Sequence, residues 1–309
     1  MFERVLVGVD GRPSGEGAIA LARQLVPPSG RLMLANVYGG GGSMGHRGAP
    51  VVSEERAAER MLTRAREASS VVAETVLIYG GVVGRALHKL AEHEKADLLV
   101  VGSSHRGEIG QVLLGSHTLT SLNNSPCAVA IAPVGYASTA RGRWAKIGVG
   151  LDGSAESELA LAAARALAEA SGAFVRGLAV VSLQGLADDQ TEGLDWTEAT
   201  EVVMMRERKR LSGIEGVFGQ VVYGEPSEEL ARFARDMDLL VVGSRAQGPL
   251  GRLMEGSTSN FLARRCPCPL LVTPRGVDDD SPDAKGRPAD RHTSRAELGR
   301  ALSLTPRPE

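Results

Sequence analysis

Cysteine, aromatic residues, net charge and long apolar runs are all scarce in this chain of 309 residues. The three cysteines are too few, and odd in number, to build a disulfide scaffold. Aromatic residues make up only 4%, which disfavours binding of single strands by base stacking. A net charge of −2 at pH 7 gives no electrostatic reason for a nucleic-acid partner. Apolar runs such as AVAIA are far too short to span a bilayer. We therefore expect neither a nucleic-acid partner nor a membrane span.

The cysteines also argue against a metal site. Cys266 and Cys268 lie one residue apart in CPCP, but no cluster of further Cys or His residues supplies the remaining ligands. We expect Cys127 and Cys268 to pack inside apolar strands. The N-terminus, MFERVLVGVD, enters a strand pattern without the basic and then apolar layout of a secretory signal, which predicts a cytoplasmic protein.

What the chain does have is an internal repeat. The segment DLLVVGSSHRGEIGQVLLGS from Asp97 returns as DLLVVGSRAQGPLGRLMEGS from Asp238. The segment VLVGVDGRPS from Val5 returns as IGVGLDGSAE from Ile147, and SPCAVAIAP returns as CPCPLLVTP. One unit of roughly 135 residues therefore occurs twice. The repeat predicts domains at 1–135 and 144–275, a short linker from Gly135 to Gly142, and a tail at 276–309.

Each unit alternates short apolar strands with amphipathic helices. The expected strands are 5–9, 32–37, 72–78, 98–101 and 128–132, then 147–151, 174–181, 218–222, 239–242 and 270–273. Ser14 and Ser154 are candidate N-caps for the first helix of each unit. Continuously apolar strands separated by helices are typical of a parallel sheet covered on both faces. We therefore predict an α/β protein with two tandem doubly wound sheets.

The polar, Pro- and Gly-rich tail at 276–309 is expected to be disordered. A capping box from Ser294 to Glu297 precedes Leu298, Ala301 and Leu302, which is also compatible with a short helix that docks on a partner. Of the two, we favour a frayed, solvated tail.

An acidic residue and a glycine-rich stretch follow predicted strands in both units. Asp10 and Gly102 come directly after strands in the first unit, as Asp152 and Gly243 do in the second. In doubly wound sheets ligands bind beyond the carboxyl ends of the strands, at the point where the strand order reverses. If the first and fourth strands flank that point, each acidic residue and its glycine face the same crevice.

The glycine stretches have the spacing expected of a phosphate cradle. They comprise Gly102, Gly107, Gly110 and Gly115 before Ser116, and Gly243, Gly248, Gly251 and Gly256 before Ser257. Phosphate binding needs converging N–H donors and little side-chain bulk, both of which glycine and a helix N-terminus provide. The alternative is that the glycines only make a tight strand-to-helix turn. No GKS or GKT follows, so the stretch is not a Walker A motif, and it does not follow the first strand as a Rossmann fingerprint would.

Up to about Arg275 the chain resembles a tandem universal stress protein. The resemblance rests on the Asp after the first strand, the G-x2-G-x9-G-[ST] stretch after the fourth, and the endings SPCAVAIA and CPCPLLVT. It implies two open five-stranded sheets of order 3-2-1-4-5, of the adenine nucleotide alpha hydrolase-like type, which pair through their fifth strands. Some members of the family bind ATP and others do not.

The resemblance also implies a set of site residues. Asp10 would lie near the adenosine, the backbone of Val37 against the adenine, and Gly102, Gly115 and Ser116 at the phosphates. The counterparts in the second unit are Asp152, Val180, Gly243, Gly256 and Ser257. The implied cofactor is ATP, with magnesium. Arg106 and Arg245 are candidates for neutralising phosphate charge, and His46 and Arg47 for closing over a ligand, although a surface role explains these four as well.

The sequence departs from the family motif at its second glycine, which is His105 in the first unit and Ala246 in the second. A non-glycine residue held at positive φ costs on the order of 1–3 kcal/mol. Ala246 adds only a methyl group, whereas the His105 side chain could occlude phosphates or donate a hydrogen bond to them. We therefore expect the second unit to be the better nucleotide site.

The function expected from these residues is a regulatory stress protein that binds an adenine nucleotide, and not an enzyme. One alternative is a protein-interaction paralogue with empty pockets. A less favoured alternative is a slow ATP hydrolase, because hydrolysis needs a positioned base and a metal, and Asp10 and Asp152 are the only obvious carboxylates. Whether two chains form a homodimer is left open by the sequence.

Overall fold

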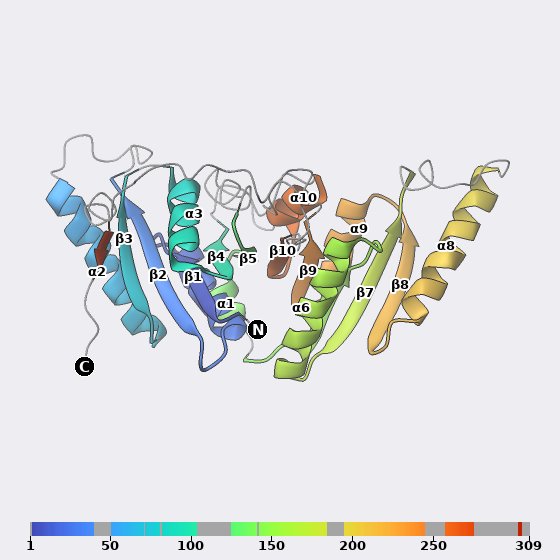
Figure 1. The fold of residues 1–309 in the computed structure, drawn as a ribbon, viewed down its shortest axis with the longest axis horizontal. Helices are drawn as coiled ribbons and strands as arrows, with labels where there is room; N and C mark the ends of the chain where they lie inside the picture. Colours follow the sequence, from blue (N-terminus) through green and yellow to red (C-terminus); the bar gives the residue numbers. More distant parts are fainter. Residues whose placement is uncertain are drawn as a thin grey trace, which may run out of the picture.

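The computed structural model describes residues 2–39, 51–70, 72–80, 82–103, 125–140, 142–183, 195–244, 257–274 and 302–304. These residues form two α/β units joined edge to edge (Figure 1). In Figure 1 helices α2 and α8 lie at the two far ends of the molecule, and strands β5 and β10 lie next to each other near its centre. The predicted α/β class with two repeats is confirmed.

The first unit is a parallel sheet with the order β3-β2-β1-β4-β5, which is the predicted 3-2-1-4-5 order. Within the described residues its helices are α1 to α3, and residues 104–124, between β4 and β5, lie outside them. The elements are β1 (Arg4–Gly8), α1 (Pro13–Leu25), β2 (Arg31–Tyr38), α2 (Val51–Ser69), β3 (Glu74–Tyr79), α3 (Val83–Glu94), β4 (Leu98–Gly102) and β5 (Ala128–Ala132).

The second unit has the equivalent order β8-β7-β6-β9-β10, again with every neighbouring pair parallel. Its elements are β6 (Lys146–Gly150), α6 (Ala155–Ser171), β7 (Phe174–Val181), α8 (Trp196–Ser212), β8 (Val217–Tyr223), α9 (Pro226–Phe233), the short η1 (Ala234–Asp236), β9 (Leu239–Gly243), α10 (Ser257–Arg265) and β10 (Leu270–Thr273).

The two sheets are continuous, because β5 and β10 pair antiparallel. Ile131 lies opposite Leu270, Ala130 opposite Leu271, and Val129 opposite Val272. With the short β11, the result is one 11-stranded sheet. This is the pairing through fifth strands that the family resemblance implied.

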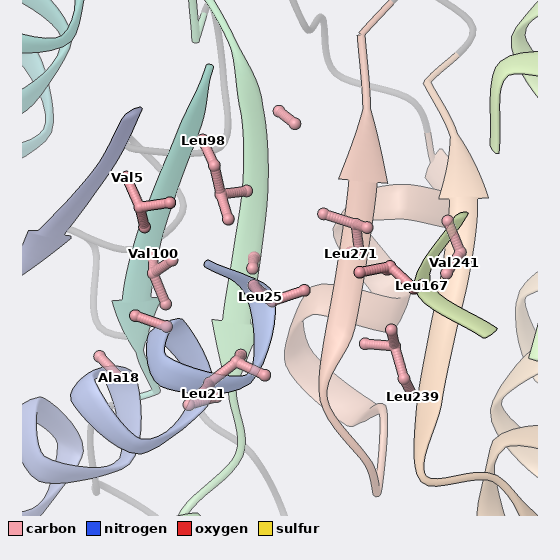
Figure 2. Packing of buried hydrophobic residues seen from close by; sticks show 14 of the residues in the cluster. Val5, Ala18, Leu21, Leu25, Leu98, Val100, Leu167, Leu239, Val241 and Leu271 are labelled. Atoms are coloured by element: carbon pink, nitrogen blue, oxygen red, sulfur yellow. The ribbon is translucent and has the colours of Figure 1, made fainter. Parts of the chain in front are cut away.

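The pairing of β5 with β10, which we call the joint, is crossed by two hydrophobic clusters, one on each face of the sheet. On the face covered by α1 and α6, one cluster contains residues of both units, among them Leu25, Leu98, Leu167 and Leu271 (Figure 2). On the opposite face, a second cluster likewise includes residues of β4, β5, β9 and β10. Because each core is shared, the joint buries apolar side chains on both sides in addition to its backbone hydrogen bonds.

The predicted linker contains a helical turn, α5 (Tyr136–Thr139), that packs against α1. The buried Tyr136 hydroxyl donates to Gln24 Oε1 at 2.7 Å and accepts from Trp144 Nε1 at 3.4 Å. Trp144 is itself buried. The connection between the units is therefore part of the packed structure, which its short polar sequence did not indicate.

Within the predicted tail, Leu302–Leu304 form β11, which pairs antiparallel with Val76–Ile78 of β3. The sequence had suggested a helix or a frayed chain around Leu302. The pairing supplies hydrogen-bond partners to an edge strand, which a helix at that place would not do. Residues 275–301 and 305–309, with the candidate capping box, lie outside the described residues. No helix in the described ranges is long and apolar enough to cross a bilayer.

Candidate functional site

Asp10 closes a turn at the carboxyl end of β1. Its Oδ1 accepts the backbone N–H of Arg12 at 3.1 Å, and the Ser14 hydroxyl donates to both carboxylate oxygens, at 3.2 and 3.0 Å. This is an Asx-type turn, in which the side chain replaces a backbone partner. The Asp10 side chain stays exposed, and a carboxylate has lone pairs beyond the three used here. We call Asp10–Ser14 the first acidic turn.

The expected capping role of Ser14 is wrong. Arg12 is the N-cap of α1 and makes no side-chain cap, and Pro13 takes the first helical position. The helix of the second unit begins at the equivalent position, so Ser14 corresponds to Glu156 and not to Ser154. Ser14 therefore lies inside the first helical turn, where its hydroxyl reaches back to Asp10.

Asp152 makes the equivalent turn after β6, which we call the second acidic turn (Asp152–Ser154). Asp152 Oδ1 accepts the backbone N–H of Ser154 at 3.0 Å and the Ser154 hydroxyl. Ser154 is the N-cap of α6, and its hydroxyl oxygen accepts the N–H of Ser157 at 3.2 Å. The predicted cap is confirmed in this unit. Asp152 is exposed, as Asp10 is.

Each acidic turn leads into a helix whose first turn lies against the end of the neighbouring strand. A Cβ added to Gly102, the last residue of β4, would lie 2.0 Å from the Ser14 carbonyl oxygen. A Cβ on Gly243, the last residue of β9, would lie 2.4 Å from the Glu156 carbonyl oxygen. The contact alone requires glycine at both positions, so packing explains the first glycine of each stretch independently of any phosphate.

The acidic turns lie at the topological switch points. The strand order reverses between β1 and β4, and again between β6 and β9. α1 and α2 contribute to the core on one face of the sheet, and α3 contributes to the core on the other. The chain thus leaves β1 and reaches β4 on opposite faces, and doubly wound sheets bind their ligands beyond the carboxyl ends of two such strands. Asp10 and Gly102 border this position together, as the sequence predicted, and Asp152 and Gly243 border the second one.

Ser103 is a candidate site residue that sequence reasoning missed. It follows Gly102, is 1% exposed, and its hydroxyl has no hydrogen-bond partner among the residues described. Its backbone N–H donates to Ala132 O at 2.9 Å, which holds the residue at the strand end. A buried polar atom without a partner calls for an explanation, and a ligand is one. The signal was present, because a serine follows the first motif glycine in both repeats, as Ser103 and Ser244.

Val37 and Val180 lie near the carboxyl ends of β2 and β7. Both side chains are partly buried against the core cluster on the α3 and α9 face. In the sheet register Val37 lies opposite Ile78 and Val180 opposite Val222. The residues just before Asp10 and Asp152 donate their backbone N–H groups to Ala35 O and Leu178 O. Each valine lies two residues after that acceptor. Their proposed contact with adenine stays a prediction.

The remaining predicted phosphate contacts fall mostly outside the described residues. Those outside are His105, Gly115, Ser116, Ala246 and Gly256, together with Arg106, Arg245, His46, Arg47 and the intermediate glycines Gly107, Gly110, Gly248 and Gly251. Ser257 is described: it is the exposed first residue of α10. Its place at a helix N-terminus is compatible with an anion contact.

The three cysteines are buried and free, in agreement with a packing role. Burial raises the pKa of the Cys127 thiol to about 12. The Cys266 and Cys268 sulfur atoms are 3.8 Å apart, and the hydrogen bond with Cys266 and then burial raise the pKa of Cys268. Such thiols carry little nucleophilic thiolate at neutral pH. In the described part of the chain, no three His, Cys, Asp or Glu side chains gather as a metal site.

A model of the universal stress protein family matches the chain twice, over residues 1–133 and 143–274. The two matches correspond to the two halves of the continuous sheet. The family resemblance inferred from the motifs is therefore confirmed.

Individual relatives agree with this match. A universal stress protein of Mycobacterium tuberculosis is 30% identical over 184 residues, which are 58% of this chain and 62% of that protein. The chain thus matches less than two thirds of the length of this relative. A universal stress protein of Thermus aquaticus is 30% identical over 136 residues, 42% of this chain and 97% of its own length. Its length corresponds to a single unit of the repeat.

A solved structure of similar architecture extends over both units. The crystal structure of a universal stress protein from Archaeoglobus fulgidus superposes with a TM-score of 0.64 at 21% identity, and the match covers 88% of this chain and 98% of that one. At this level of identity the similarity shows the fold.

Proposed function

The chain belongs to the universal stress protein family, and on that premise we propose that it binds an adenine nucleotide, ATP being the first candidate, beside at least one acidic turn. The observation that supports this most directly is the juxtaposition at each switch point of an exposed Asp with the strand end that begins a glycine stretch. Doubly wound sheets bind their ligands at this place.

The residues present fit such a ligand. The exposed carboxylates of Asp10 and Asp152 suit acceptance of a hydrogen bond from a ribose hydroxyl or an adenine amino group. The buried Ser103 hydroxyl, which lacks a partner among the described residues, suits a phosphate oxygen in the first unit. Magnesium is usually bound through one or two carboxylates together with substrate phosphates, so it would arrive with the nucleotide.

We propose that the second unit is the stronger site. Ala246 replaces a motif glycine with only a methyl group, whereas His105 places an imidazole at the equivalent position of the first unit. We further propose a regulatory role, in which nucleotide changes the population of a conformation or a complex through its differential affinity. Each Asp carboxylate already accepts hydrogen bonds within its own turn, which suits a fixed binding group better than a general base.

The test begins with protein purified from cells, from which any bound nucleotide is released and identified by mass spectrometry. Calorimetric titration with ATP and magnesium then measures affinity for wild type, Asp152→Ala and Asp10→Ala. Loss of a hydrogen bond to a charged group costs about 1.5–3 kcal/mol, so we expect Asp152→Ala to bind about 10- to 100-fold more weakly. Asp10→Ala is the matched control and should have the smaller effect.

A second substitution tests the phosphate end. Gly256→Val should weaken ATP binding if the second cradle is occupied, and Gly115→Val is its counterpart in the first unit. Steady release of phosphate that Asp152→Ala abolishes would favour the hydrolase alternative. Absence of ATP binding by the folded wild-type protein would overturn the proposal and favour the protein-interaction alternative.

A further inference from the structure

The backbone carbonyl just before each acidic residue accepts a side-chain hydrogen bond, but from a different element in each unit. In the first unit the carbonyl of Val9 accepts Asn36 Nδ2, from β2, at 2.7 Å. In the second unit the carbonyl of Leu151 accepts Arg210 Nη2, from the last turns of α8, at 3.2 Å. Both bonds hold the peptide unit that leads into the acidic turn.

The second unit cannot use the first unit's donor. The N–H of Val9 donates to Ala35 O, and the N–H of Leu151 donates to Leu178 O. Asn36 directly follows Ala35 and Ala179 directly follows Leu178, so Ala179 is the counterpart of Asn36. Ala179 is 2% exposed and has no side-chain donor. A carbonyl left without a partner at a partly buried strand end costs free energy, which explains why another donor takes this place.

Arg210 is well placed to replace it. Its side chain is 28% exposed, and Glu207 accepts from its Nη2 at 2.6 Å and from its Nε at 3.0 Å. This two-point ion pair orients the guanidinium. Gly153, within the second acidic turn, has φ of +79°, and its missing Cβ would lie 3.7 Å from Arg210 Cζ. In the first unit the equivalent Gly11 faces the apolar side chain of Met61 instead.

We propose that Arg210 is the positioning residue of Asp152, and that it does from helix α8 what Asn36 does for Asp10 from strand β2. The first acidic turn is thereby tied to the sheet, while the second is tied to a covering helix. A displacement of α8 would be transmitted to Asp152, but the equivalent movement of α2 would not reach Asp10 by this route. Only the consequence for nucleotide affinity rests on the proposed function.

The primary test is amide hydrogen exchange in the absence of nucleotide. The Ser154 N–H, which donates to Asp152 Oδ1, reports on the second acidic turn, and the Arg12 N–H, which donates to Asp10 Oδ1, reports on the first. In Arg210→Met we expect the Ser154 amide to exchange at least about tenfold faster, with the Arg12 amide unchanged, because one hydrogen bond to a charged group is lost. Asn36→Ala should give the reverse result.

Two further variants separate positioning from general loss of structure. Glu207→Gln keeps the donor to Leu151 and should leave Ser154 exchange within about twofold of wild type. Adding Ala179→Asn to Arg210→Met supplies the first unit's donor and should restore protection. If that double variant does not fold, Arg210→Lys, which keeps a charged N–H donor, should protect Ser154 more than Arg210→Met does.

Unchanged Ser154 exchange in a folded Arg210→Met variant would overturn the inference, as would equal acceleration of the Arg12 amide. Titration of the same variants with ATP is a separate experiment that tests the proposed function. Faster exchange in a protein that binds no ATP would leave the positioning role in place and contradict only the proposed function.

Discussion

The first unit holds its acidic turn through neutral groups, whereas the second uses an ionised side chain from a covering helix. Asn36 and Ser14 serve Asp10, and Arg210 and Ser154 serve Asp152. Both turns nevertheless place a glycine at positive φ, +70° at Gly11 and +79° at Gly153, and continue into an extended N-cap residue. A duplicated fold can therefore keep a backbone geometry while the side chains that satisfy it are replaced, because the requirement is a donor at the carbonyl and not a particular residue.

The covering helices of the two units also join the core through different positions. Ala58 and Leu62 of α2 belong to the main core of the first unit. In α8, Leu211 belongs to the same cluster, and Val203 forms a small separate cluster with Val181. Residues Trp196, Val202 and Met205 of α8 are exposed. The outer face of α8 is thus exposed, while Leu211 fixes its last turn, beside Arg210, in the shared core.

The largest expected difference between wild type and variant concerns the strand-end glycines. A Cβ at position 102 would meet a backbone oxygen at 2.0 Å, and one at position 243 at 2.4 Å. Overpacking against backbone costs about 1–3 kcal/mol or more. We expect Gly102→Ala to lower the free energy of unfolding by about 3 kcal/mol and Gly243→Ala by somewhat less. Urea unfolding followed by circular dichroism measures both.

Gly142→Ala is the matched control for these glycines. Nothing lies within 4 Å of a Cβ built on Gly142, and its φ lies outside the left-handed region. Its free energy of unfolding should stay within about 0.5 kcal/mol of wild type. If Gly102→Ala were as stable as this control, the result would contradict the close contact between the Ser14 carbonyl of α1 and Gly102 of β4.

A smaller difference is expected at the helix starts. Ser154→Ala removes an N-cap and should cost about 1 kcal/mol. Ser14→Ala removes only hydrogen bonds to the Asp10 carboxylate, which is exposed and screened by solvent, and should cost about 0.5 kcal/mol. Thermal unfolding of the two variants makes the comparison, and Ser154→Asp, which keeps a capping oxygen, should resemble wild type. Equal losses in both alanine variants would mean that Ser14 also caps its helix.

The smallest effect at neutral pH is expected for substitution of the cysteines that precede β5 and β10. The pKa of Cys127 is raised to about 12 by burial, so its thiol is neutral in the folded protein. The stabilisation from the buried neutral thiol is complete below the ordinary thiol pKa of 9.0 and is lost as pH rises toward 12. We expect wild type to lose stability above pH 9 more steeply than Cys127→Ala, measured by urea unfolding at several pH values.

Thiol labelling extends this comparison to the second unit. Ser125 takes the place in the first repeat that Cys266 takes in the second. All three thiols should resist iodoacetamide at pH 7.5 until the protein is unfolded, because burial denies access and raises the pKa of Cys127 and Cys268. Rapid labelling of Cys268 in the native protein would contradict its burial at the joint.

Much of the fold could be predicted because its signals are local and occur twice. Apolar runs such as Leu98–Val101 and Leu239–Val242 fall within observed strands, and Asp10 and Asp152 follow strands as expected. Ser14 was misassigned because the start of a helix is a choice between neighbouring positions, and the N-cap position is occupied by Arg12. Ser103 was missed because its burial depends on packing around the end of β4.

The sequence by itself determines the alternation of apolar strands and helices, the duplication and the places of the acidic residues, since each depends on neighbours in the chain. Only the tertiary structure decides the joining of the two sheets through β5 and β10, the close approach of Ser14 to Gly102 and the exchange of Asn36 for Arg210. These contacts join residues that lie from 27 to 143 positions apart, and their partners are selected by packing and by the need to satisfy buried backbone groups.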